Sequence, residues 1–594
     1  MAAVSISQVQ SPNVLKNQLA ATTAGNGAAL VNFKLDVTGA TVRTLLSLAG
    51  DSVNALQFMS ESDKTDILDE TLNNDVTTKL QAALDSGYKH IIIPNGAYKV
   101  TSKLTVPADV FLHGYNTTID SSTAHFEVIE FTSGGGMRGI NLNGAGDTSL
   151  TVGSIGIKCY GTNNNPSAPT YVTGPIIDGC KIENFGEYGV KFEYVKTAIV
   201  SNCIIDEIGY AGIGGVSCED IIVDGNIISD ITQGSSTDGY GIFIDRKNGV
   251  SETENPRSYR CVITNNIVKN VDTGGNGQGI DTHAGIDFVI DGNVVQGCDS
   301  GIRLAASKIG ATTEELGCVR CVVSNNVVQR SLTGGGENIA IGVSGAIDGS
   351  TVNEYAIDNV VSGNTLVGYG NAGTASTGAV KIQATKNTII SGNVIRASSV
   401  NCLYLNLENK NLNVHGNTLI DPWDDTATAP SCIRVGGNNN TGIIKNNLFV
   451  YEDSSLGTYV AVNALRTDSS LTGLDLDISE CGFIGIDASH LNNALSTTTG
   501  INTLGMFKES GTFAISVSNS AAEFSQAVSF NKRFPYTPDV QLTLRHTFSV
   551  GGDNPIIGIG NGTLSQTGFT VYAKTADNGN WGGSGTINGY WMAM

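Results

Sequence analysis

The sequence contains little charge, and it lacks long apolar segments. Only 15% of its 594 residues are Asp, Glu, Lys or Arg. No run reaches the roughly 18 uninterrupted apolar residues of a membrane-spanning helix, so we expect no membrane partner. Acidic residues outnumber basic ones, and the net charge is −21 at pH 7. This charge argues against nucleic acid and anionic membranes as partners, because both repel an acidic protein.

Signals for export and for metal binding are also missing. The N-terminal stretch MAAVSISQVQSP has neither the basic region nor the apolar region of a signal peptide. Most of the 11 Cys residues stand in apolar runs, which favours reduced core thiols in a protein that folds in a cytosol. Cys318 and Cys321 form one CxxC, without a second pair at zinc-finger spacing. We therefore expect no metal and no other cofactor.

Glycine, by contrast, is abundant. The 73 Gly residues show no G-X-Y period, so a collagen helix is excluded. A chain that is rich in glycine and poor in charge suits an all-β protein with many turns better than a helical one. Its length exceeds one ordinary core, so we expect several domains or a repeat array.

One short phrase recurs along the chain: two or three apolar residues, a short polar turn, and two more mostly apolar residues. The copies are IIDGCKI (176–182), IVSNCII (199–205), IIVDGNII (221–228), CVITNNIV (261–268), FVIDGNVV (288–295), CVVSNNVV (321–328), VVSGNTL (360–366), TIISGNVI (388–395), LNVHGNTL (412–419) and GIIKNNLF (442–449). Aligning the third turn residue gives spacings of 23, 23, 40, 27, 33, 38, 29, 24 and 30. A constant minimum with a variable excess indicates one coil per repeat, with loops inserted at its corners.

These coils predict a parallel β-helix. Gly-Asn and Asn-Asn turns supply the positive φ that a corner needs, and a single coil cannot bury its apolar face without stacked neighbours. Asn residues at equivalent corners, such as Asn293 and Asn326, are expected to form a hydrogen-bonded ladder. A β-propeller is the alternative fold, but its blades run to about 40–45 residues and the spacing here is often shorter.

A further strand follows each turn, in segments 189–192, 212–216, 241–245, 279–283, 301–305 and 339–343. Alternation turns every second side chain outward, and stacking places the outward residues in columns. One predicted column is Lys191, Gly214, Phe243, Asp281, Arg303 and Ala340. The next is Glu193, Val216, Asp245, His283, Ala305 and Gly342. Charged residues in the middle and small residues beside them predict the floor of a groove.

Two long inserts follow this groove floor in the sequence. KNGVSETENPRSYR comes directly after Asp245 and Arg246, and KIGATTEELG follows Arg303. Both inserts are expected to form a wall beside the groove, because long corner loops usually carry function. The predicted substrate-binding residues are Phe243 on the floor and Arg246, Glu252, Glu254, Arg257 and Tyr259 from the insert.

The N-terminal part of the chain carries a resemblance to a known family. Residues 73–87 predict a short helix that Asn74 or Asp75 caps and Gly87 ends, and 90–100 and 104–114 predict strands. The run NDVTTKLQAALDSG…IIIPNGAYKV…LTVPADVFLHG resembles the entry segment of the pectate-lyase-like β-helices of bacteriophage tailspikes. GNGAALVNF…GATVRTLL (25–46) resembles the linker before that segment. The resemblance covers about residues 25–490.

The C-terminal region differs in composition, because the coil phrase disappears from about Gly511. Segments 527–544, 568–579 and 590–594 predict a small β-sandwich. Their order is similar to the receptor-binding sandwich domains that end some tailspikes and are related to H-type lectins. Trp581, Tyr590 and Trp591 are expected either to stack on sugar rings or, more often for such residues, to pack in the core or between subunits.

The resemblance implies an all-β, right-handed parallel β-helix that is homotrimeric and belongs to the virion. It implies a tailspike made in the host cytoplasm that acts outside the bacterial cell, where it binds and depolymerises capsular polysaccharide or O-antigen. The expected domains are 1–50, an attachment segment for a tail or baseplate adaptor; 51–120, a cap; 121–500, the β-helix with its groove; and 508–594, a sandwich for trimerisation and possible sugar binding.

Two cleavage chemistries are open at the predicted groove. Hydrolysis needs two carboxyls, and Asp245 and Asp281 would supply them at a Cβ separation of ~7–9 Å. His283 would then tune Asp245, and Arg303 would bind a substrate carboxylate or keep Asp281 ionised; Glu252 and Glu254 are alternative acids.

β-Elimination would instead use His283 as the base and Arg303 as the cation on a uronate. We favour hydrolysis, because carboxylates outnumber cations around the predicted floor. A non-enzymatic adhesin that only binds in this groove is the third reading. The same side chains could also be merely solvated or lie between subunits, where Asp206, Glu207 and Asp238 are reserve candidates.

Overall fold

The structure is a computed structural model, and the part of the chain that it describes has gaps. The described residues are 32–33, 43–44, 52–146, 151–165, 167–232, 238–247, 251–271, 277–308, 315–330, 339–348, 351–370, 377–422, 430–451, 463–468, 471–484, 501–502, 509–517, 523–529, 540–544, 555–560, 563–565, 568–575 and 585–593. The predicted attachment segment 1–50 therefore lies outside them, apart from the short strands β1 (Asn32–Phe33) and β2 (Arg43–Thr44). Two compact units divide the chain: the second contains residues 164–168, 215–220 and 228–594, and the first contains the rest.

The first unit begins with β3 (Val53–Asn54), the short 3-10 helix η3 (Ala55–Phe58) and two α-helices. The sequence predicted one helix over 73–87; the structure has α4 (Thr77–Leu84) there and a second helix, α3 (Glu61–Leu68). Ser60 and Asp63 cap α3 reciprocally, since each side chain accepts a hydrogen bond from the backbone N–H of the other. Asp75 accepts from the Thr77 N–H at 3.0 Å.

Parallel strands then stack in the first unit, as the sequence predicted. His90 pairs with Phe111 and Leu104 pairs with Ile129. The strands are β4 (His90–Ile93), β5 (Gly96–Lys99), β6 (Leu104–Val106), β7 (Phe111–Asp120), β8 (Glu127–Phe131), β9 (Gly136–Asn143), β10 (Ile155–Tyr160), β11 (Val172–Thr173), β12 (Ile176–Asp178), β13 (Lys181–Phe185), β14 (Tyr188–Glu193), β15 (Val195–Lys196), β16 (Ile199–Ser201), β17 (Ile204–Ile208) and β19 (Ile222–Asp224). Strands β18 (Ala211–Val216) and β20 (Ile227–Ile231) lie where the units change.

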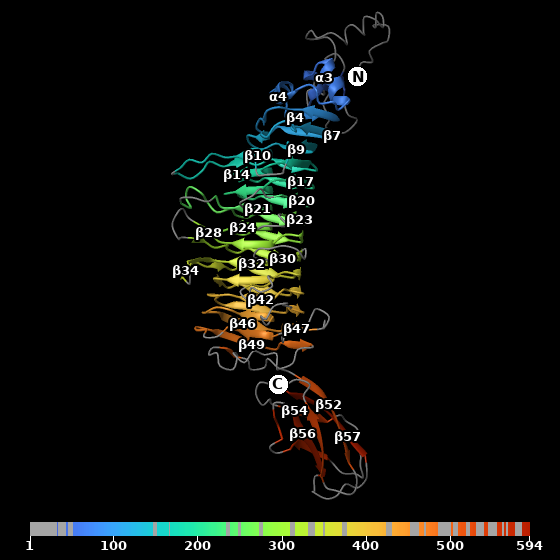
Figure 1. The fold of residues 1–594 in the computed structure, drawn as a ribbon, viewed down its shortest axis with the longest axis vertical. Coiled ribbons are helices and arrows are strands. Elements are labelled where there is room, and N and C mark those ends of the chain that lie inside the picture. The colour runs from blue at the N-terminus through green and yellow to red at the C-terminus, as the bar shows by residue number, and fades with distance from the viewer. Residues whose placement is uncertain are drawn as a thin grey trace, which may run out of the picture. The chain divides into compact units, whose positions relative to one another are not determined.

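The second unit is a parallel β-helix with three strands per coil, and Figure 1 shows successive coils stacked one below another through β24, β32 and β42. We call the three stacks of strands the first, second and third faces.

The first face holds β22 (Val262–Thr264), β25 (Val289–Asp291), β30 (Val322–Ser324), β36 (Val360–Ser362), β40 (Ile389–Ser391), β43 (Leu412–His415), β46 (Thr441–Lys445) and β49 (Asp475–Ser479). The second holds β23 (Ile267–Val271), β26 (Val294–Gln296), β31 (Val327–Gln329), β37 (Thr365–Val367), β41 (Val394–Arg396), β44 (Thr418–Ile420), β47 (Leu448–Val450) and β50 (Gly482–Ile484). The third holds β21 (Tyr240–Asp245), β24 (Gln278–His283), β27 (Ser300–Ala305), β32 (Ile341–Ser344), β38 (Val380–Gln383), β42 (Asn401–Leu405), β45 (Ser431–Val435) and β48 (Asn463–Thr467).

The core of this β-helix is a stack of aliphatic side chains, one above another. On the first face Ile263, Ile290 and Val323 are in register and have no exposed surface. Burial of each such side chain contributes roughly 1.5–3 kcal/mol. Because every coil repeats this layer, the stack buries what a single coil would expose.

The predicted ladder of corner Asn residues is confirmed. Asn293 donates its side-chain N–H to Asn326 at 3.0 Å, and Asn326 donates to Asn364 at 3.0 Å in the next coil. The same contact continues through Asn393, Asn417 and Asn447. The ladder residues are buried, and the turn residue before each has a positive φ. The ladder therefore satisfies polar corners that would otherwise be buried without partners.

The C-terminal region contains two antiparallel three-stranded sheets, β52-β57-β54 and β53-β56-β55. The strands are β52 (Glu509–Val517), β53 (Glu523–Ser529), β54 (Val540–Leu544), β55 (Pro555–Ile559), β56 (Gly568–Thr575) and β57 (Gly585–Ala593). Trp591 is buried and meets the ring of Phe569 edge-on at 5.6 Å. This position favours the core role over sugar stacking for Trp591. Trp581 and the side chain of Tyr590 lie outside the described part.

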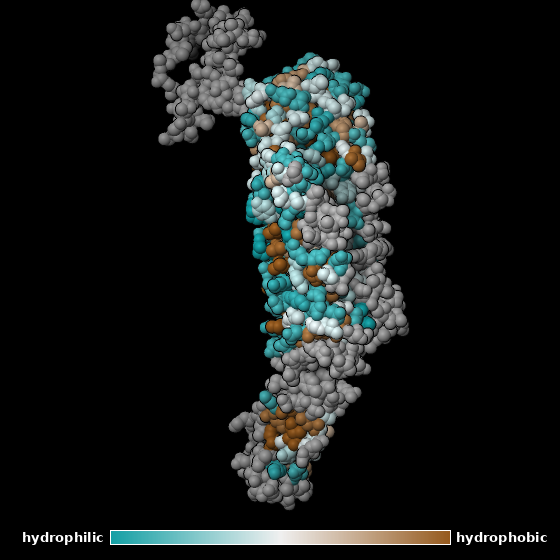
Figure 2. All heavy atoms as spheres, turned by 90° about the vertical axis from the view of Figure 1, so that its left-hand side faces the viewer, coloured by the Kyte–Doolittle hydropathy of each residue, from teal (hydrophilic) through white to brown (hydrophobic). Residues whose placement is uncertain are grey.

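All 11 Cys residues, including Cys318 and Cys321, are buried thiols outside any disulfide. In the described part of the chain, no helix combines the length and the apolar character needed to cross a bilayer. Two short hairpins, β28 (Ser307–Lys308) with β29 (Glu315–Leu316) and β33 (Ala346–Asp348) with β34 (Thr351–Glu354), follow strands of the third face. Figure 2 views the side of the β28 and β34 labels, where the coloured surface is mostly hydrophilic and hydrophobic residues form separate patches.

Candidate active site on the third face

The third face brings the predicted groove residues together. Phe243 pairs with Asp281, and Asp281 pairs with Arg303. His283 pairs with Ala305 in the second outward column. The prediction was wrong for the next coil, because Arg303 pairs with Gly342 rather than with Ala340. Ala340 is buried one position before β32.

His283 is fixed by two acceptors. Its Nδ1 lies 2.8 Å from the carbonyl oxygen of Ala306, and its Nε2 lies 2.9 Å from a carboxylate oxygen of Asp281. A carbonyl can only accept, so Nδ1 carries a proton, and the carboxylate favours a proton on Nε2. Although burial opposes the charged form, the carboxylates of Asp281 and Asp245 raise the pKa of His283 to about 10. The ring is therefore held as an imidazolium.

Asp281 differs from the exposed groove carboxylate that the sequence predicted. Its side chain points outward by strand alternation, yet its exposed fraction is 0%, whereas His283 is 29% exposed. In its column it stands between Phe243 and Arg303, whose larger side chains extend further from the sheet. Asp281 is thus placed to hold His283, beneath the accessible surface.

Asp245 is half-buried at the end of β21. One carboxylate oxygen accepts the backbone N–H of His283 at 2.7 Å. Burial raises the pKa of Asp245 to about 7, and the nearby Asp281 charge adds to this rise while His283 opposes it. Carboxylate oxygens of Asp245 and Asp281 lie within 4.8 Å of each other. His283 therefore contacts Asp245 through its backbone, and its ring contacts Asp281.

The same three residues offer a donor set that a metal ion could use, since their ligand atoms lie within 4.8 Å of one another. Both ring nitrogens of His283 are already engaged, by Ala306 and Asp281. The positive charge of Arg303 also acts on Asp245 and His283. A cation here would have to displace one of these contacts, so we assign no metal to the site.

A polar pocket of about 270 Å³ opens on the third face next to this cluster. Two of its charged lining residues, His283 and Arg303, belong to the predicted groove, and Ala305 and Gly342 supply small floor positions. Its remaining lining residues are Leu304, Ala306, Ile339, Val343, Ser344, Gly345, Ile347, Lys381 and Gln383.

The sequence analysis missed three polar lining residues: Ser344, Lys381 and Gln383. Gly342 pairs with Lys381 and Ser344 pairs with Gln383, so both columns continue beyond the point where the predicted ones ended. The segment AVKIQ (379–383) has the right alternation and could have revealed them.

Three predicted substrate-binding residues, one from the floor and two from the insert, are buried. Phe243 is 5% exposed and packs against the ring of Tyr240 at 4.9 Å. Arg246 is 2% exposed and donates to the carbonyl of Ser251 at 3.0 Å. Glu254 is also buried. The Arg246 contact holds the insert against its own start.

Arg257 fastens the same insert to later coils. Its guanidinium contacts Glu252 at 2.7 Å, Glu354 at 2.8 Å and the carbonyl of Gly317 at 3.0 Å. Tyr259 lies under the guanidinium of Arg260, at 4.0 Å from the ring centre. These contacts connect loops of neighbouring coils, and of the predicted insert residues only Glu252 is largely exposed, at 46% of its side chain.

The reserve carboxylates do not join the cluster. Asp206 and Glu207 lie in β17 of the first unit. Asp238 lies before β21, where its carboxylate accepts from the Tyr240 hydroxyl at 3.4 Å.

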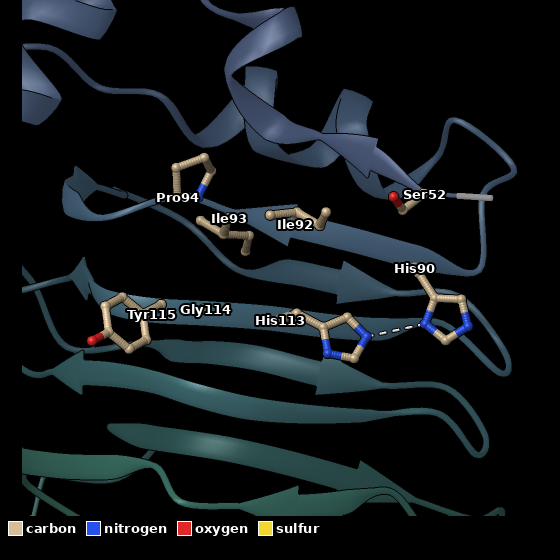
Figure 3. Close-up of a pocket in the computed structure, with 8 residues that line it drawn as sticks. All are labelled: Ser52, His90, Ile92, Ile93, Pro94, His113, Gly114 and Tyr115. Atoms are coloured by element: carbon tan, nitrogen blue, oxygen red, sulfur yellow. Dashed lines mark hydrogen bonds between the residues drawn. The ribbon is translucent and has the colours of Figure 1, made fainter. Parts of the chain in front are cut away.

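Figure 3 shows a second pocket, of about 440 Å³, beside β4 and β7 in the first unit. His90 Nδ1 and His113 Nε2 lie 3.0 Å apart there, and Tyr115 beside them is 87% exposed. Burial, together with the charges of His90 and Arg138, lowers the pKa of His113. One of the two rings donates this hydrogen bond and the other accepts it. No carboxylate is among the lining residues, so this pocket suits acid–base chemistry less well.

The stacked parallel strands and their buried Asn ladder define a parallel β-helix, and the polar site lies on its outer surface. The family model described as a right handed beta helix region matches residues 114–308. The fold is therefore the right-handed parallel β-helix that the sequence predicted. No curated protein matches the chain significantly in sequence.

Solved structures share this fold. The tailspike protein gp49 of Pseudomonas phage LKA1 matches with a TM-score of 0.52 and 13% identity, over 91% of this chain and 99% of that chain. A mutant of the tailspike protein of E. coli bacteriophage HK620, in complex with a pentasaccharide, matches with a TM-score of 0.50 and 13% identity, over 98% of this chain and 99% of that chain. At these identities, the likeness concerns the fold.

Proposed function

We propose that this chain is a bacteriophage tailspike that binds and cleaves a bacterial surface polysaccharide on the third face of its β-helix. The likeness to tailspike structures, one of them bound to a pentasaccharide, supports this class. The observation that carries the enzymatic part is the half-buried Asp245 beside the Asp281–His283 contact, next to an open polar pocket.

Asp245 is the general acid of the proposed reaction. Protonation of the leaving glycosidic oxygen is needed in hydrolysis, and a pKa of about 7 keeps much of this carboxyl protonated near neutral pH. Two neighbouring carboxyls in different environments divide the roles of acid and anion between them. Asp281 has no exposed surface and acts as a positioning residue that keeps Asp245 protonated. When the glycosidic oxygen has left with the proton of Asp245, a water molecule adds to the anomeric carbon and returns a proton to the Asp245 carboxylate.

Hydrolysis remains our preference over elimination. Elimination would need a free base near the sugar, and His283 has both ring nitrogens engaged by Asp281 and Ala306. Elimination has one observation in its favour, since Arg303 and Lys381 line the pocket and suit the carboxylate of a uronate.

Replacement of Asp245 by Asn tests this proposal. Loss of a general acid lowers the rate by about 10²–10⁴-fold, whereas binding of the polymer should persist because the side chain keeps its shape. Reducing ends and the ultraviolet absorbance of unsaturated uronate are followed together on capsular polysaccharide from a susceptible host. Asp477→Asn, an exposed carboxylate on β49, is the matched control.

Each outcome has one meaning. Reducing ends without absorbance, lost in Asp245→Asn alone, would agree with hydrolysis. Absorbance would mean elimination and would refute the assignment of hydrolysis. Binding by the unchanged protein without any cleavage would leave a non-enzymatic adhesin.

We further propose that the chain is a homotrimer, attached to a phage tail or baseplate adaptor through residues 1–50. Apolar side chains on the outside of the second face support self-association. Ile267, Val294 and Val327 are in register and are 41%, 39% and 42% exposed. Val394 continues this column at 38%, after Thr365. Exposed aliphatic columns of this kind mark interaction surfaces.

The subunit count is measured by analytical ultracentrifugation. Val294→Lys should weaken self-association, because it places a charge in the middle of the aliphatic column. Thr351→Lys, on the exposed hairpin strand β34, is the control. A monomer in the unchanged protein would disprove the trimer.

A further inference from the structure

Two cations stand on either side of a gap in one outward column of the third face. Arg303 pairs with Gly342, and Gly342 pairs with Lys381. Neighbouring strands lie about 4.8 Å apart, so the two cationic residues are separated by roughly twice that distance. Gly342 contributes no side chain between them. All three residues line the 270 Å³ pocket, so the pocket lies over the gap.

The backbone at Gly342 leaves room for a side chain. A Cβ at this position would meet Ile339 Cγ2 at 3.6 Å and Arg303 Cγ at 3.9 Å, which are ordinary contacts. Gly342 is not among the glycines with a positive φ. Because neither backbone strain nor close packing requires glycine here, the open volume is the feature that glycine supplies.

The pocket is cationic in an acidic protein. Three of its lining residues are His283, Arg303 and Lys381, and none of its described lining residues is Asp or Glu. The whole chain carries 55 acidic and 34 basic residues. His283 contributes positive charge as well, since its ring forms an ion pair with Asp281 and lies 2.8 Å from the carbonyl oxygen of Ala306. Such a concentration of one sign favours an anion.

Neutral donors complete the lining. Gln383 accepts a hydrogen bond from the Asn406 side chain at 2.7 Å through its oxygen, which orients its NH₂ group as the remaining donor. Ser344, its partner in register, adds a hydroxyl. The volume lies just below the roughly 300 Å³ at which pockets begin to hold drug-sized ligands. One sugar ring fits this size better than an oligosaccharide.

We propose that the pocket over Gly342 is a subsite for one acidic sugar residue, whose carboxylate lies between Arg303 and Lys381. This inference rests on the proposed function and names its substrate class: an acidic polysaccharide. The planar guanidinium of Arg303 binds a carboxylate through two parallel hydrogen bonds, and Lys381 adds a point charge. Gln383 and Ser344 bind hydroxyl groups of the same ring.

The subsite borders the proposed general acid. His283 lines the pocket, and its backbone N–H donates to Asp245. An acidic residue bound here therefore places a neighbouring glycosidic bond toward Asp245. A neutral residue in the same place would offer Arg303 and Lys381 no carboxylate, and sites built for polar groups reject ligands that lack them.

Binding of monosaccharide probes tests the subsite without depending on cleavage. The probes are methyl glycosides of glucuronate, galacturonate, mannuronate and N-acetylneuraminate, each paired with its carboxyl-reduced neutral analogue, and ligand-observed NMR measures their dissociation constants. At least one acidic probe should bind about tenfold more tightly than its neutral analogue, as expected for a charge-assisted hydrogen bond. Inorganic sulfate is included as a competitor.

Three variants locate the binding. Lys381→Gln should remove about tenfold of the preference for the acidic probe and leave the neutral analogue unchanged. Gly342→Leu should abolish binding of both, because it fills the pocket and keeps every charge. Lys445→Gln, a half-buried lysine on β46 of the first face, removes the same charge elsewhere and should change nothing.

The outcomes separate this proposal from the proposed function. If no acidic probe is preferred over its analogue, or if Lys445→Gln acts like Lys381→Gln, the subsite is wrong, while cleavage of the polymer can still be measured. If sulfate displaces the acidic probe as well as a free uronate does, the pocket is a general anion site and the sugar assignment is wrong. If the probes bind as expected but no polysaccharide is cleaved, the subsite stands and the enzymatic proposal fails.

Discussion

The charge of Asp281 controls when Asp245 can deliver a proton, and Asp281→Asn tests this relation. The substitution keeps the shape of the buried side chain and removes its negative charge. The carboxylate oxygens of the two residues lie within 4.8 Å of each other. Because the Asp281 charge raises the pKa of Asp245, its removal should lower that pKa.

The size of the shift follows from Coulomb's law. Two unit charges 4.8 Å apart interact by about 3.5 kcal/mol at an effective dielectric constant of ~20. Since one pKa unit corresponds to about 1.36 kcal/mol, this energy corresponds to a shift of ~2.5 units. Asp245 is half-buried, so solvent screens part of this interaction. Loss of the Asp281 charge also lowers the pKa of His283 and so reduces the positive charge beside Asp245. We therefore expect the pKa of Asp245 to fall by about 1–2 units.

The pH dependence of kcat/KM measures this shift. A general acid must be protonated, so the rate should fall about tenfold per pH unit above the pKa of the free enzyme. In the unchanged protein this fall should begin near pH 7, where the pKa of Asp245 lies. In Asp281→Asn it should begin near pH 5–6, and Asp477→Asn should leave it in place. If the fall of kcat/KM at alkaline pH begins at the same pH in Asp281→Asn, or at a higher pH, Asp245 is not the general acid.

Three further predictions concern stability and the insert. Asn364→Ala should lower the free energy of unfolding by roughly 2–4 kcal/mol, because it leaves the buried N–H groups of Asn326 without their acceptor; denaturant unfolding measures this, and an unchanged midpoint would contradict it. The pKa of His283 is raised from 6.5 to about 10, so the stability it contributes is full below pH 6.5 and is lost as pH rises toward 10. The melting temperatures of the unchanged protein and of an Asp281→Asn/His283→Asn double variant are measured against pH, and the two curves should converge over that range. Parallel curves would show that the titration of His283 does not contribute to stability. Arg257→Gln should expose the insert to limited proteolysis, since it removes the ion pairs and the carbonyl contact that hold the loop; an unchanged digestion pattern would argue against this role.

The repeated part of the fold could be predicted from the sequence, because the residues that determine a coil lie within that coil. The apolar pair on each side of the turn fixes which residues face inward, and the Asn at each corner fixes the register with the next coil. The ladder through Asn293, Asn326 and Asn364 lies where the alignment of the turns placed it. Helix α3 was missed, since its eight residues ESDKTDIL are mostly polar and carry no clear apolar stripe.

The site was harder to predict, because its geometry depends on pairing between coils of unequal length. Either Ala340 or Gly342 can be aligned with Arg303 without changing which side chains face outward. The sequence analysis chose Ala340, which is two residues away from the true partner, Gly342. Lys381 lies 78 positions beyond Arg303 in sequence, too far for any local pattern to connect them. The burial of Asp281 and Arg246 depends on how neighbouring side chains and the insert cover them, which strand alternation does not encode.

The Asn ladder has a consequence for how genes of such proteins can recombine. From Asn293 to Asn447, each coil meets the next at its corner through the same buried Asn-to-Asn contact. A gene segment that encodes one whole coil therefore ends in a junction that fits any other coil boundary. Recombination between distant genes can exchange, add or lengthen coils at these junctions while the stack stays closed. In a β-helix built in this way, the sequences of the outward loops can diverge while the core is kept.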